Sequence, residues 1–312
     1  MIATVTLNPS LDAWVELSAL RVGALNRATG FCRSLGGKGI NVSRVVQELG
    51  ERPIAFGVAG GEDGLNLRQL MSRVHLRHEF VAIPGTTRSN YKVRTATHRA
   101  VTEINTSGPR VPRNALRILE HTLFDHRPTP HGMVFSGSLP PGVPVTIYQR
   151  WIRRARRASI PTILDASGQA FHEGLRARPW LIKPNRHEAE ELLRCSLKSR
   201  VACVRAASEL LRLGAEVVVL SLGAEGALIA GSVLDGLWFA APPRVHVDST
   251  VGAGDALIGG LLVGWLRHRS LLEAFRLGVA CGAATAMTPG TELCHRATVR
   301  RLLPRVRLHR VA

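Results

Sequence analysis

Short apolar runs alternate along the chain with segments whose apolar residues recur at helical spacing. Apolar runs that each end in a polar or glycine turn cover residues 51–60, 131–138, 161–167, 180–185 and 215–223. Helical spacing is found around residues 39–49, 113–125, 145–158, 186–194 and 200–213. Near-continuous apolar strands separated by helices are typical of a parallel sheet that is covered on both faces. The pattern therefore predicts an α/β fold with a mostly parallel central sheet and helices on both faces.

Two earlier segments have a different pattern. Residues 12–34 and about 86–104 alternate polar residues with β-formers, which predicts antiparallel strands. We expect the two segments to pair as one small β-sheet, a lid over the open end of a single domain that spans residues 1–312. A small isolated sheet is only marginally stable. We therefore also expect two lids to pair, which would make the protein a homodimer.

Composition narrows the class of protein. A chain of 312 residues with 45% hydrophobic residues is long enough for one large domain with a sizeable core. Apolar stretches are all shorter than the roughly 18 residues that a membrane span requires. The first residues lack a basic leader, and the five cysteines are an odd number without C-x-x-C spacing. These features favour a cytoplasmic protein that does not act at a membrane.

The formal charge is +18, from 41 basic and 23 acidic residues. Such an excess suits either nucleic acid or an anionic substrate. The basic residues are scattered, and the densest run, "RWIRRARR" at 150–157, fits the exposed face of a helix that turns Trp151, Ile152 and Ala155 inward. Since no nucleic-acid recognition motif accompanies the charge, we expect a small anionic substrate and no nucleic acid.

The stretch "DSTVGAGDALIGGLL" at 248–262 is the first candidate for chemistry. Its small residues Gly252, Ala253 and Gly254 lead into Asp255 at the start of an apolar helix. A glycine-rich turn entering a helix offers free N–H groups and the positive end of the helix dipole to a phosphoryl group. Asp255 could then accept a proton from an attacking hydroxyl. The alternative is an aspartate that only stabilises the helix start.

The stretch "GGKGIN" at 36–41 is a second candidate. Gly36 and Gly37 permit close backbone approach, Lys38 adds a cation, and Asn41 can bond sugar hydroxyls. Because Gly39 follows Lys38, this is not a nucleotide-binding loop of the Walker type. A tight strand-to-helix turn would be the simpler interpretation.

Four further residues have polar side chains suited to binding a sugar phosphate. Asp12 follows the first strand and can accept two hydroxyl donors, as sugar recognition requires. Arg88, Asn90 and Lys92 alternate, so they share one strand face, and arginine suits forked binding of a phosphate. By itself this face could simply be solvated.

The stretch "KPNRHEAEEL" at 183–192 places Asn185 and Glu188 three residues apart at a predicted helix start. An acidic residue in a first turn commonly caps the helix. The alternative is a carboxylate that holds hydrated Mg²⁺, an ion that prefers one or two carboxylates together with phosphate oxygens.

Together these stretches resemble the PfkB carbohydrate kinase family, whose fold is ribokinase-like. The resemblance covers nearly the whole chain and rests on "GGKGIN", "KPNRHE" and "DSTVGAGD" in this order and spacing. It implies an enzyme, an ATP-dependent kinase that uses Mg²⁺ with ATP and possesses a site for a monovalent cation such as K⁺.

The resemblance also implies individual roles. Asp255 would be the catalytic base, with an anion hole formed by Gly252, Ala253 and Gly254. The sugar phosphate would contact Asp12, Gly37, Lys38, Asn41, Arg88, Asn90 and Ser138. The nucleotide would contact Lys183, Asn185, Ser221, Gly223 and Gly226. Glu188 would hold Mg²⁺ through water, and the monovalent cation would be bound near Ser249, Val251, Thr285 and Gly290.

Other stretches narrow the branch. "TLNPSLD", "TRSNYKV", "TEINTSGP" and "SGSLPPGVP" resemble kinases that take hexose phosphates, the phosphofructokinases and tagatose-6-phosphate kinases. The tail "GTELC" at 290–294 is similar to the minor bacterial 6-phosphofructokinase, which favours fructose 6-phosphate as the acceptor. The alternatives are 1-phosphofructokinase and tagatose-6-phosphate kinase, and, more distantly, a non-catalytic sugar-phosphate sensor. Glu292 stands where that 6-phosphofructokinase carries a basic residue, which leaves the monovalent-cation site open.

Overall fold

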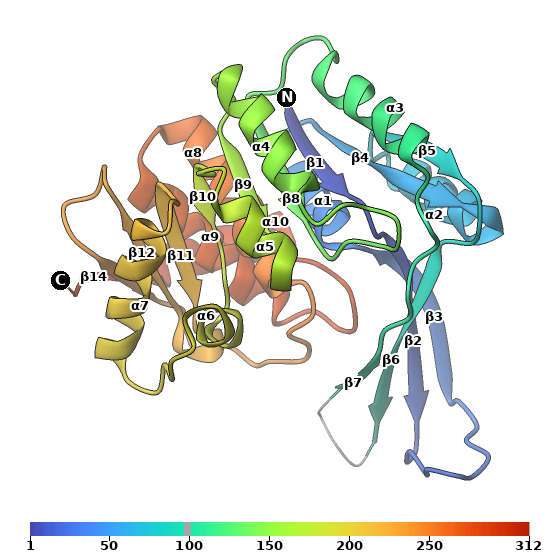
Figure 1. Cartoon of the computed structure of the whole chain (residues 1–312). Helices are drawn as coiled ribbons and strands as arrows, with labels where there is room; N and C mark the ends of the chain where they lie inside the picture. Colours follow the sequence, from blue (N-terminus) through green and yellow to red (C-terminus); the bar gives the residue numbers. More distant parts are fainter. Residues whose placement is uncertain (97–100, 312) are drawn as a thin grey trace.

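A ten-stranded sheet forms the centre of the protein (Figure 1). The computed structural model describes residues 1–96 and 101–311. In sheet order the strands are β14 (Arg307–Arg310), β13 (Trp238–Ala241), β12 (Ala227–Gly231), β11 (Val217–Ser221), β10 (Leu181–Ile182), β9 (Thr162–Asp165), β8 (Gly132–Ser136), β1 (Ile2–Thr6), β4 (Pro53–Gly60) and β5 (His78–Ile83). The strands from β11 to β5 run parallel, as the apolar runs predicted. The antiparallel edge of β12, β13 and β14 was not predicted.

Helices cover both faces of this sheet, which confirms the predicted α/β architecture. One face packs α3 (Arg113–Phe124), α4 (Ile147–Arg157), α5 (Gly168–Leu175), α6 (Arg186–Leu193) and α7 (Arg200–Arg212). The other face packs α1 (Lys38–Glu48), α2 (Gly61–Arg73), α8 (Ala253–His268), α9 (Leu271–Thr285) and α10 (Arg296–Leu302). Strands β1, β4 and β8 are buried along their whole length because side chains from helices meet them on both sides.

The arginine-rich helix α4 has the predicted orientation. Trp151, Ile152 and Ala155 are completely buried, while Arg153 and Arg156 are exposed. In the described part of the chain, no helix combines the length and the apolar character that crossing a bilayer requires.

A separate four-stranded sheet projects from this body, and we call it the small sheet (Figure 1). Its order is β3 (Gly30–Gly36), β2 (Ser10–Leu17), β6 (Arg88–Thr95) and β7 (Val101–Ile104). The two predicted segments do pair, although residues 97–100 of the second lie outside the described part. Whether the sheet closes as a lid, and whether residues 1–312 act as one domain, stay predictions.

The pairing between the two segments is parallel, so the expectation of an entirely antiparallel sheet was wrong. Each segment is an antiparallel hairpin, β2 with β3 and β6 with β7. However, β2 follows β1 and β6 follows β5, and these two strands of the large sheet point in the same direction. The first strands of both hairpins therefore leave the large sheet in the same direction and pair in parallel.

The small sheet has two chemically different faces. The register places Asp12 beside Asn90 and Trp14 beside Lys92, so these polar side chains share one face with Arg88. The opposite face carries Ala13, Val15, Phe31, Tyr91, Val93 and Ile104. Phe31 is 60% exposed and Ile104 is 52% exposed, so the apolar face is partly open to solvent.

Candidate active site

Unpaired buried polar atoms mark the region between the two sheets. Thr6 Oγ1 and Ser136 Oγ, at the carboxyl ends of β1 and β8, have no hydrogen-bond partner in the described part of the chain. The same holds for Asn8 Oδ1 and Asn90 Oδ1 near the small sheet. Buried polar atoms are normally paired, so a cluster of exceptions indicates a place built for a ligand. The ends of parallel strands are where such ligands bind in α/β folds.

The N-terminus of α8 brings together two of the predicted motifs. Gly252 precedes the helix with φ 77°, and a side chain there would lie 2.6 Å from Leu293. The left-handed backbone and the close contact explain why glycine stands at this position. Asp255, in the first turn, accepts a hydrogen bond of 2.8 Å from Asn41 Nδ2. Asn41, predicted to contact the sugar, is thus seen holding the predicted base.

A second carboxylate, Asp165 at the end of β9, lies between two lysines. Lys38 Nζ is 3.3 Å and Lys183 Nζ is 3.4 Å from its carboxylate oxygens. Burial opposes ionisation of Asp165, yet the charges of Lys183 and Lys38 hold the pKa of its carboxyl below the ordinary value. Asp165 in turn raises the pKa of Lys38. Lys38, predicted to grip the sugar's resident phosphate, therefore lies between the carboxylates of Asp165 and Glu188.

Asp165 was not among the predicted site residues. The signal was present, since an apolar strand ends on a single charged residue at the edge where ligands bind. Lys183 also lies close to the predicted anion hole. A β-carbon on Gly254 would lie 3.3 Å from Lys183 Nζ. Lys183 thus lies beside the start of α8, and Lys38 shares the carboxylate of Asp165 with it.

Asp255 has the ionisation behaviour of a general base. Burial, followed by the negative charge of Asp165, raises the pKa of Asp255 to about 6. Lys38, Lys183 and the hydrogen bond from Asn41 oppose this rise. A carboxylate with such a pKa is ionised at neutral pH and is still basic enough to take a proton from an activated hydroxyl.

Asn185 and Glu188 form a capping box at the start of α6. Asn185 Oδ1 accepts from the Glu188 N–H at 2.8 Å, and Glu188 Oε2 accepts from the Asn185 N–H at 2.8 Å. The capping interpretation of this pair is therefore confirmed. Glu188 Oε1 lies 3.9 Å from Lys38 Nζ, so its second oxygen faces the catalytic cluster.

These carboxylates fit Mg²⁺ held through water. The described residues contain no group of three or more acidic, histidine or cysteine side chains that could enclose a metal directly. Glu188 has one oxygen outside its capping bond, and Asp165 lies beside it across Lys38. Mg²⁺ keeps several waters and takes its remaining ligands from phosphates, so one or two carboxylates of this kind suffice.

The predicted nucleotide contacts lie on one side of this cluster. Asn185 pairs with Ser221 in an isolated bridge, and the Ser221 N–H donates to the Pro184 carbonyl at 3.0 Å. Gly223 and Gly226 both have positive φ values in the turn that follows β11. Gly223 in this turn is exposed and Gly226 is buried, and their contact with a nucleotide stays a prediction.

The polar face of the small sheet lies on the opposite side. Lys92 Nζ pairs with Asp12 Oδ2 at 3.1 Å, and both side chains are more than nine-tenths buried. Ser10 Oγ donates to Asp12 Oδ1 at 2.8 Å, and Asn90 Nδ2 donates to Ser10 Oγ at 3.0 Å. Asp12 and Asn90 are therefore held in one network, as their predicted shared role requires. Lys92 belongs to this network, although it was not assigned a role.

Arg88 and Ser138 meet through Asn8. Arg88 donates from Nε and Nη2 to the Asn8 carbonyl, at 3.3 and 3.0 Å, and from Nη1 to the Thr106 carbonyl at 3.1 Å. Asn8 Nδ2 donates to Ser138 Oγ at 3.0 Å. The described residues contain no carboxylate in an ion pair with Arg88, so its charge is free for an anion. Asn8 was not predicted as a site residue.

The residues predicted to bind a monovalent cation also come together. Ser249 Oγ donates to the Gly290 carbonyl at 2.6 Å, and the Val251 N–H donates to Ser249 Oγ at 3.3 Å. Thr285 Oγ1 accepts from the Cys294 N–H at 3.1 Å. Glu292 points away from this loop and pairs with His295 at 2.8 Å.

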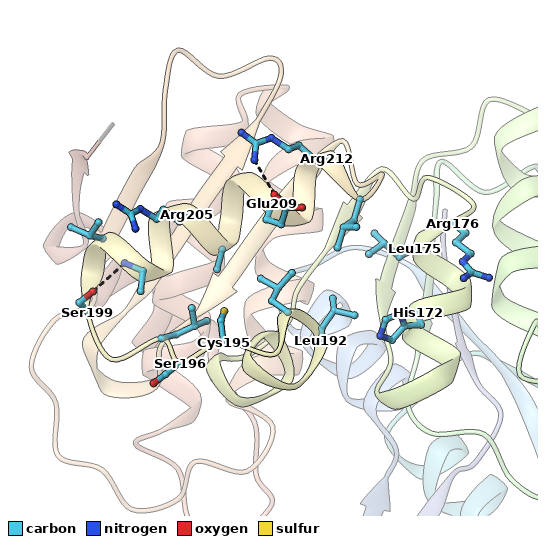
Figure 2. A pocket seen from close by; sticks show the side chains of 16 residues that line it. His172, Leu175, Arg176, Leu192, Cys195, Ser196, Ser199, Arg205, Glu209 and Arg212 are labelled. Carbon is cyan, nitrogen blue, oxygen red and sulfur yellow. Dashed lines mark hydrogen bonds and ion pairs between the residues drawn. The ribbon is translucent and has the colours of Figure 1, made fainter.

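A groove of about 950 Å³ lies elsewhere, between α5 and α7 (Figure 2). Leucines and alanines line it together with Arg176, Arg205 and Arg212. None of the predicted site residues is among the described side chains that line it. The groove is therefore separate from the site between the sheets.

An anion-binding helix start beside a buried base suits enzymes that transfer a phosphoryl group to a hydroxyl. The model of the pfkB family of carbohydrate kinases matches residues 5–298. The 1-phosphofructokinase of Bacillus subtilis (strain 168) is 35% identical over 312 residues, which is 100% of each chain. That of Escherichia coli (strain K12) is 35% identical over 313 residues, covering 98% of this chain and 97% of the relative. The chain therefore belongs to the pfkB family of carbohydrate kinases.

Solved structures agree with this assignment. Phosphofructokinase-2 from Escherichia coli in complex with potassium superposes with a TM-score of 0.91 at 32% identity, covering 97% of this chain and 98% of that one. Ribokinase from Arabidopsis thaliana, complexed with ribose and ATP, has a TM-score of 0.76 at 19% identity over 97% of this chain and 98% of that one. At this low identity, the similarity to ribokinase shows only that the two proteins share a fold.

Proposed function

We propose that this protein is a 1-phosphofructokinase, which transfers the γ-phosphoryl group of ATP to the 6-hydroxyl of fructose 1-phosphate. Two observations support this assignment: the names of relatives that match the whole chain, and the two lysines gathered around the buried carboxylate of Asp165, whose charge also acts on Asp255. ATP and sugar phosphates are cytoplasmic metabolites, so we place its activity there.

The reaction divides among the residues of the site. The acceptor oxygen attacks the γ-phosphorus, its proton passes to a carboxylate oxygen of Asp255, and the bond from phosphorus to the departing ADP oxygen breaks. Asn41 holds Asp255 in place during this step. Lys38, Lys183 and the N–H groups at the start of α8 stabilise the charge on the transferred group.

Cations would assist at two places. Mg²⁺ would be bound together with ATP and would neutralise phosphate charge. We propose that Glu188 and Asp165 would hold the ion through its water ligands. The loop with Ser249 and Gly290 would hold K⁺, a proposal supported by the potassium complex of the Escherichia coli neighbour. Backbone and hydroxyl oxygens are suitable ligands for such an ion.

The preference for fructose 6-phosphate over fructose 1-phosphate is not confirmed, because the curated relatives carry the name that was the alternative. That preference rested on the tail at residues 290–294. In the structure this tail contacts Ser249 and Thr285. Thr291 of the same tail also bonds Ser34 Oγ on the small sheet at 2.6 Å, so the tail touches both the predicted cation loop and the sheet that carries Asp12, and its sequence alone does not decide the substrate.

Substrate choice gives the direct test. We expect kcat/KM for fructose 1-phosphate to exceed the values for fructose 6-phosphate and tagatose 6-phosphate, with fructose far below all three. Replacing Arg88 with alanine should lower kcat/KM for the sugar phosphates roughly tenfold or more, since a charge-assisted contact contributes about 1.5–3 kcal/mol. The measurement is ADP release in a coupled assay.

The exposed Arg153 on α4 offers a matched control, and Arg153→Ala should leave all four values unchanged. A tenfold preference for fructose 6-phosphate would replace the proposed substrate. Binding of all the sugar phosphates without ADP release would instead support the sensor.

We further propose a homodimer formed through the apolar face of the small sheet, where Phe31, Tyr91 and Ile104 are exposed. Large exposed apolar side chains that share one face of a sheet are typical of an interface. The wild type should sediment as a dimer at micromolar concentration, and Phe31→Glu should sediment as a monomer. Val233→Glu, at a residue that is 75% exposed in the loop between β12 and β13, should remain dimeric. A fully active wild-type monomer would contradict the proposal.

A further inference from the structure

Asn8 occupies an unusual position in the site. It follows β1, is 8% exposed, and contacts three segments that are distant in the sequence. Its backbone carbonyl accepts two hydrogen bonds from Arg88, and its side-chain amide reaches Ser138. Both partners are predicted contacts of the sugar phosphate, so a single residue joins them.

The third contact is with Gly108. A β-carbon on Gly108 would lie 2.1 Å from Asn8 Oδ1, well inside van der Waals contact. Glycine is therefore the residue that permits the Asn8 side chain to occupy this place. The same loop also holds Arg88, because the Thr106 carbonyl accepts from Arg88 Nη1 at 3.1 Å.

The geometry has a chemical consequence for Arg88. Its guanidinium has five N–H donors, and the two carbonyls occupy only part of this capacity. The hydrogen bonds to the Asn8 carbonyl fix the orientation of the guanidinium and therefore the direction of its remaining N–H donors. That carbonyl is held in turn by the bond between the Asn8 amide and Ser138. Since Ser138 Oγ can donate or accept, this link survives either orientation of the amide.

We propose that Asn8 is the positioning residue of the acceptor-phosphate site, and that Gly108 is the position that admits it. The inference rests on the proposed function, because it assigns Arg88 and Ser138 to the phosphate that the sugar already carries. Asn8 acts through these two residues and does not touch the reacting atoms. Its contribution should therefore appear in binding of the sugar phosphate and not in the chemical step.

The test is a double-mutant cycle with Asn8→Ala and Gly108→Ala. We expect each single variant to raise KM for fructose 1-phosphate roughly tenfold, with kcat and KM for ATP changed less than about twofold. In Gly108→Ala the new methyl group must displace Asn8 and break its bond with Ser138. In the double variant that methyl group has room, so KM should equal that of Asn8→Ala alone.

Two controls separate positioning from folding. Gly132→Ala on β8 places its new methyl group 3.4 Å from Leu262, an ordinary contact, and should leave KM unchanged. Thermal unfolding should show that the Asn8 and Gly108 variants remain folded at the assay temperature. An unchanged KM in Asn8→Ala, or fully additive effects in the double variant, would overturn the inference. A wild type that phosphorylates none of the sugar phosphates would instead overturn the proposed function.

Discussion

Asp255→Asn is expected to lower kcat by about 10²–10⁴-fold, the usual cost of losing a general base. Asparagine retains the shape of the side chain and can still accept the hydrogen bond from Asn41, but it cannot accept the substrate's proton. Steady-state measurement of ADP release provides the test. A variant whose kcat stays near that of the wild type would remove Asp255 from this role.

The pKa of Asp255 gives this prediction a second readout. Because the pKa is about 6, wild-type kcat/KM should fall below that pH as the base becomes protonated, and the variant should lack this acidic limb. Burial raises the pKa above its ordinary value of 3.8, so ionised Asp255 lowers stability at neutral pH, and this cost disappears as the pH falls through 6 towards 4. At pH 7.5 the Asn variant should therefore unfold at no lower temperature than the wild type. Lost activity accompanied by lower stability would point to misfolding instead.

Asp165→Asn should cause the largest loss of stability among single substitutions in the site. Lys183 is 5% exposed and would lose the carboxylate 3.4 Å away. Removing one partner of a buried ion pair destabilises a protein by about 3–5 kcal/mol. Urea unfolding at pH 7.5 measures the change. Asp63→Asn, which removes an exposed ion pair with Arg33, should cost less than about 1 kcal/mol and serves as the control.

The same variant should shift the pH dependence of catalysis. The charge of Asp165 is one of the causes that raise the pKa of Asp255. Without that charge the pKa of Asp255 should fall, and the acidic limb of kcat/KM should move to lower pH. A limb that stays in place, together with unchanged stability, would show that the two carboxylates do not interact.

Much of the fold could be predicted from the sequence, because a strand that is buried on both faces consists of consecutive apolar residues. The antiparallel edge could not be, since β13 is only four residues long and β14, whose sequence is RLHR, carries no apolar run. The direction of pairing between β2 and β6 was also inaccessible. This direction depends on how the chain leaves the large sheet after β1 and after β5. The alternation of polar and apolar residues within each segment does not reveal it.

For the site, too, residues that belong to a local sequence motif could be predicted, and residues whose partners are distant in the sequence could not. The start of α8 and the motif with Lys38 and Asn41 could be found because glycine and charged residues there follow a local spacing. Asp165 ends a strand at the edge where ligands bind but was given no role, because its two lysine partners lie far along the chain, and Asn8 was missed for the same reason. Lys38 was placed at the resident phosphate because a lone lysine next to glycines does not reveal which charge it faces.

The contact between α1 and α8 has a consequence for how the protein is made. A side chain on Gly259 of α8 would lie 2.8 Å from Val45 of α1, so the two helices pack closely although they are separated by more than half of the chain. During synthesis α1 leaves the ribosome long before α8 has been made. Until then, the apolar face of α1 that packs against α8 is uncovered. Long-range contacts of this kind form late and leave intermediates prone to aggregation. On the ribosome, the central strands can pair before Asp255 has been added to the chain.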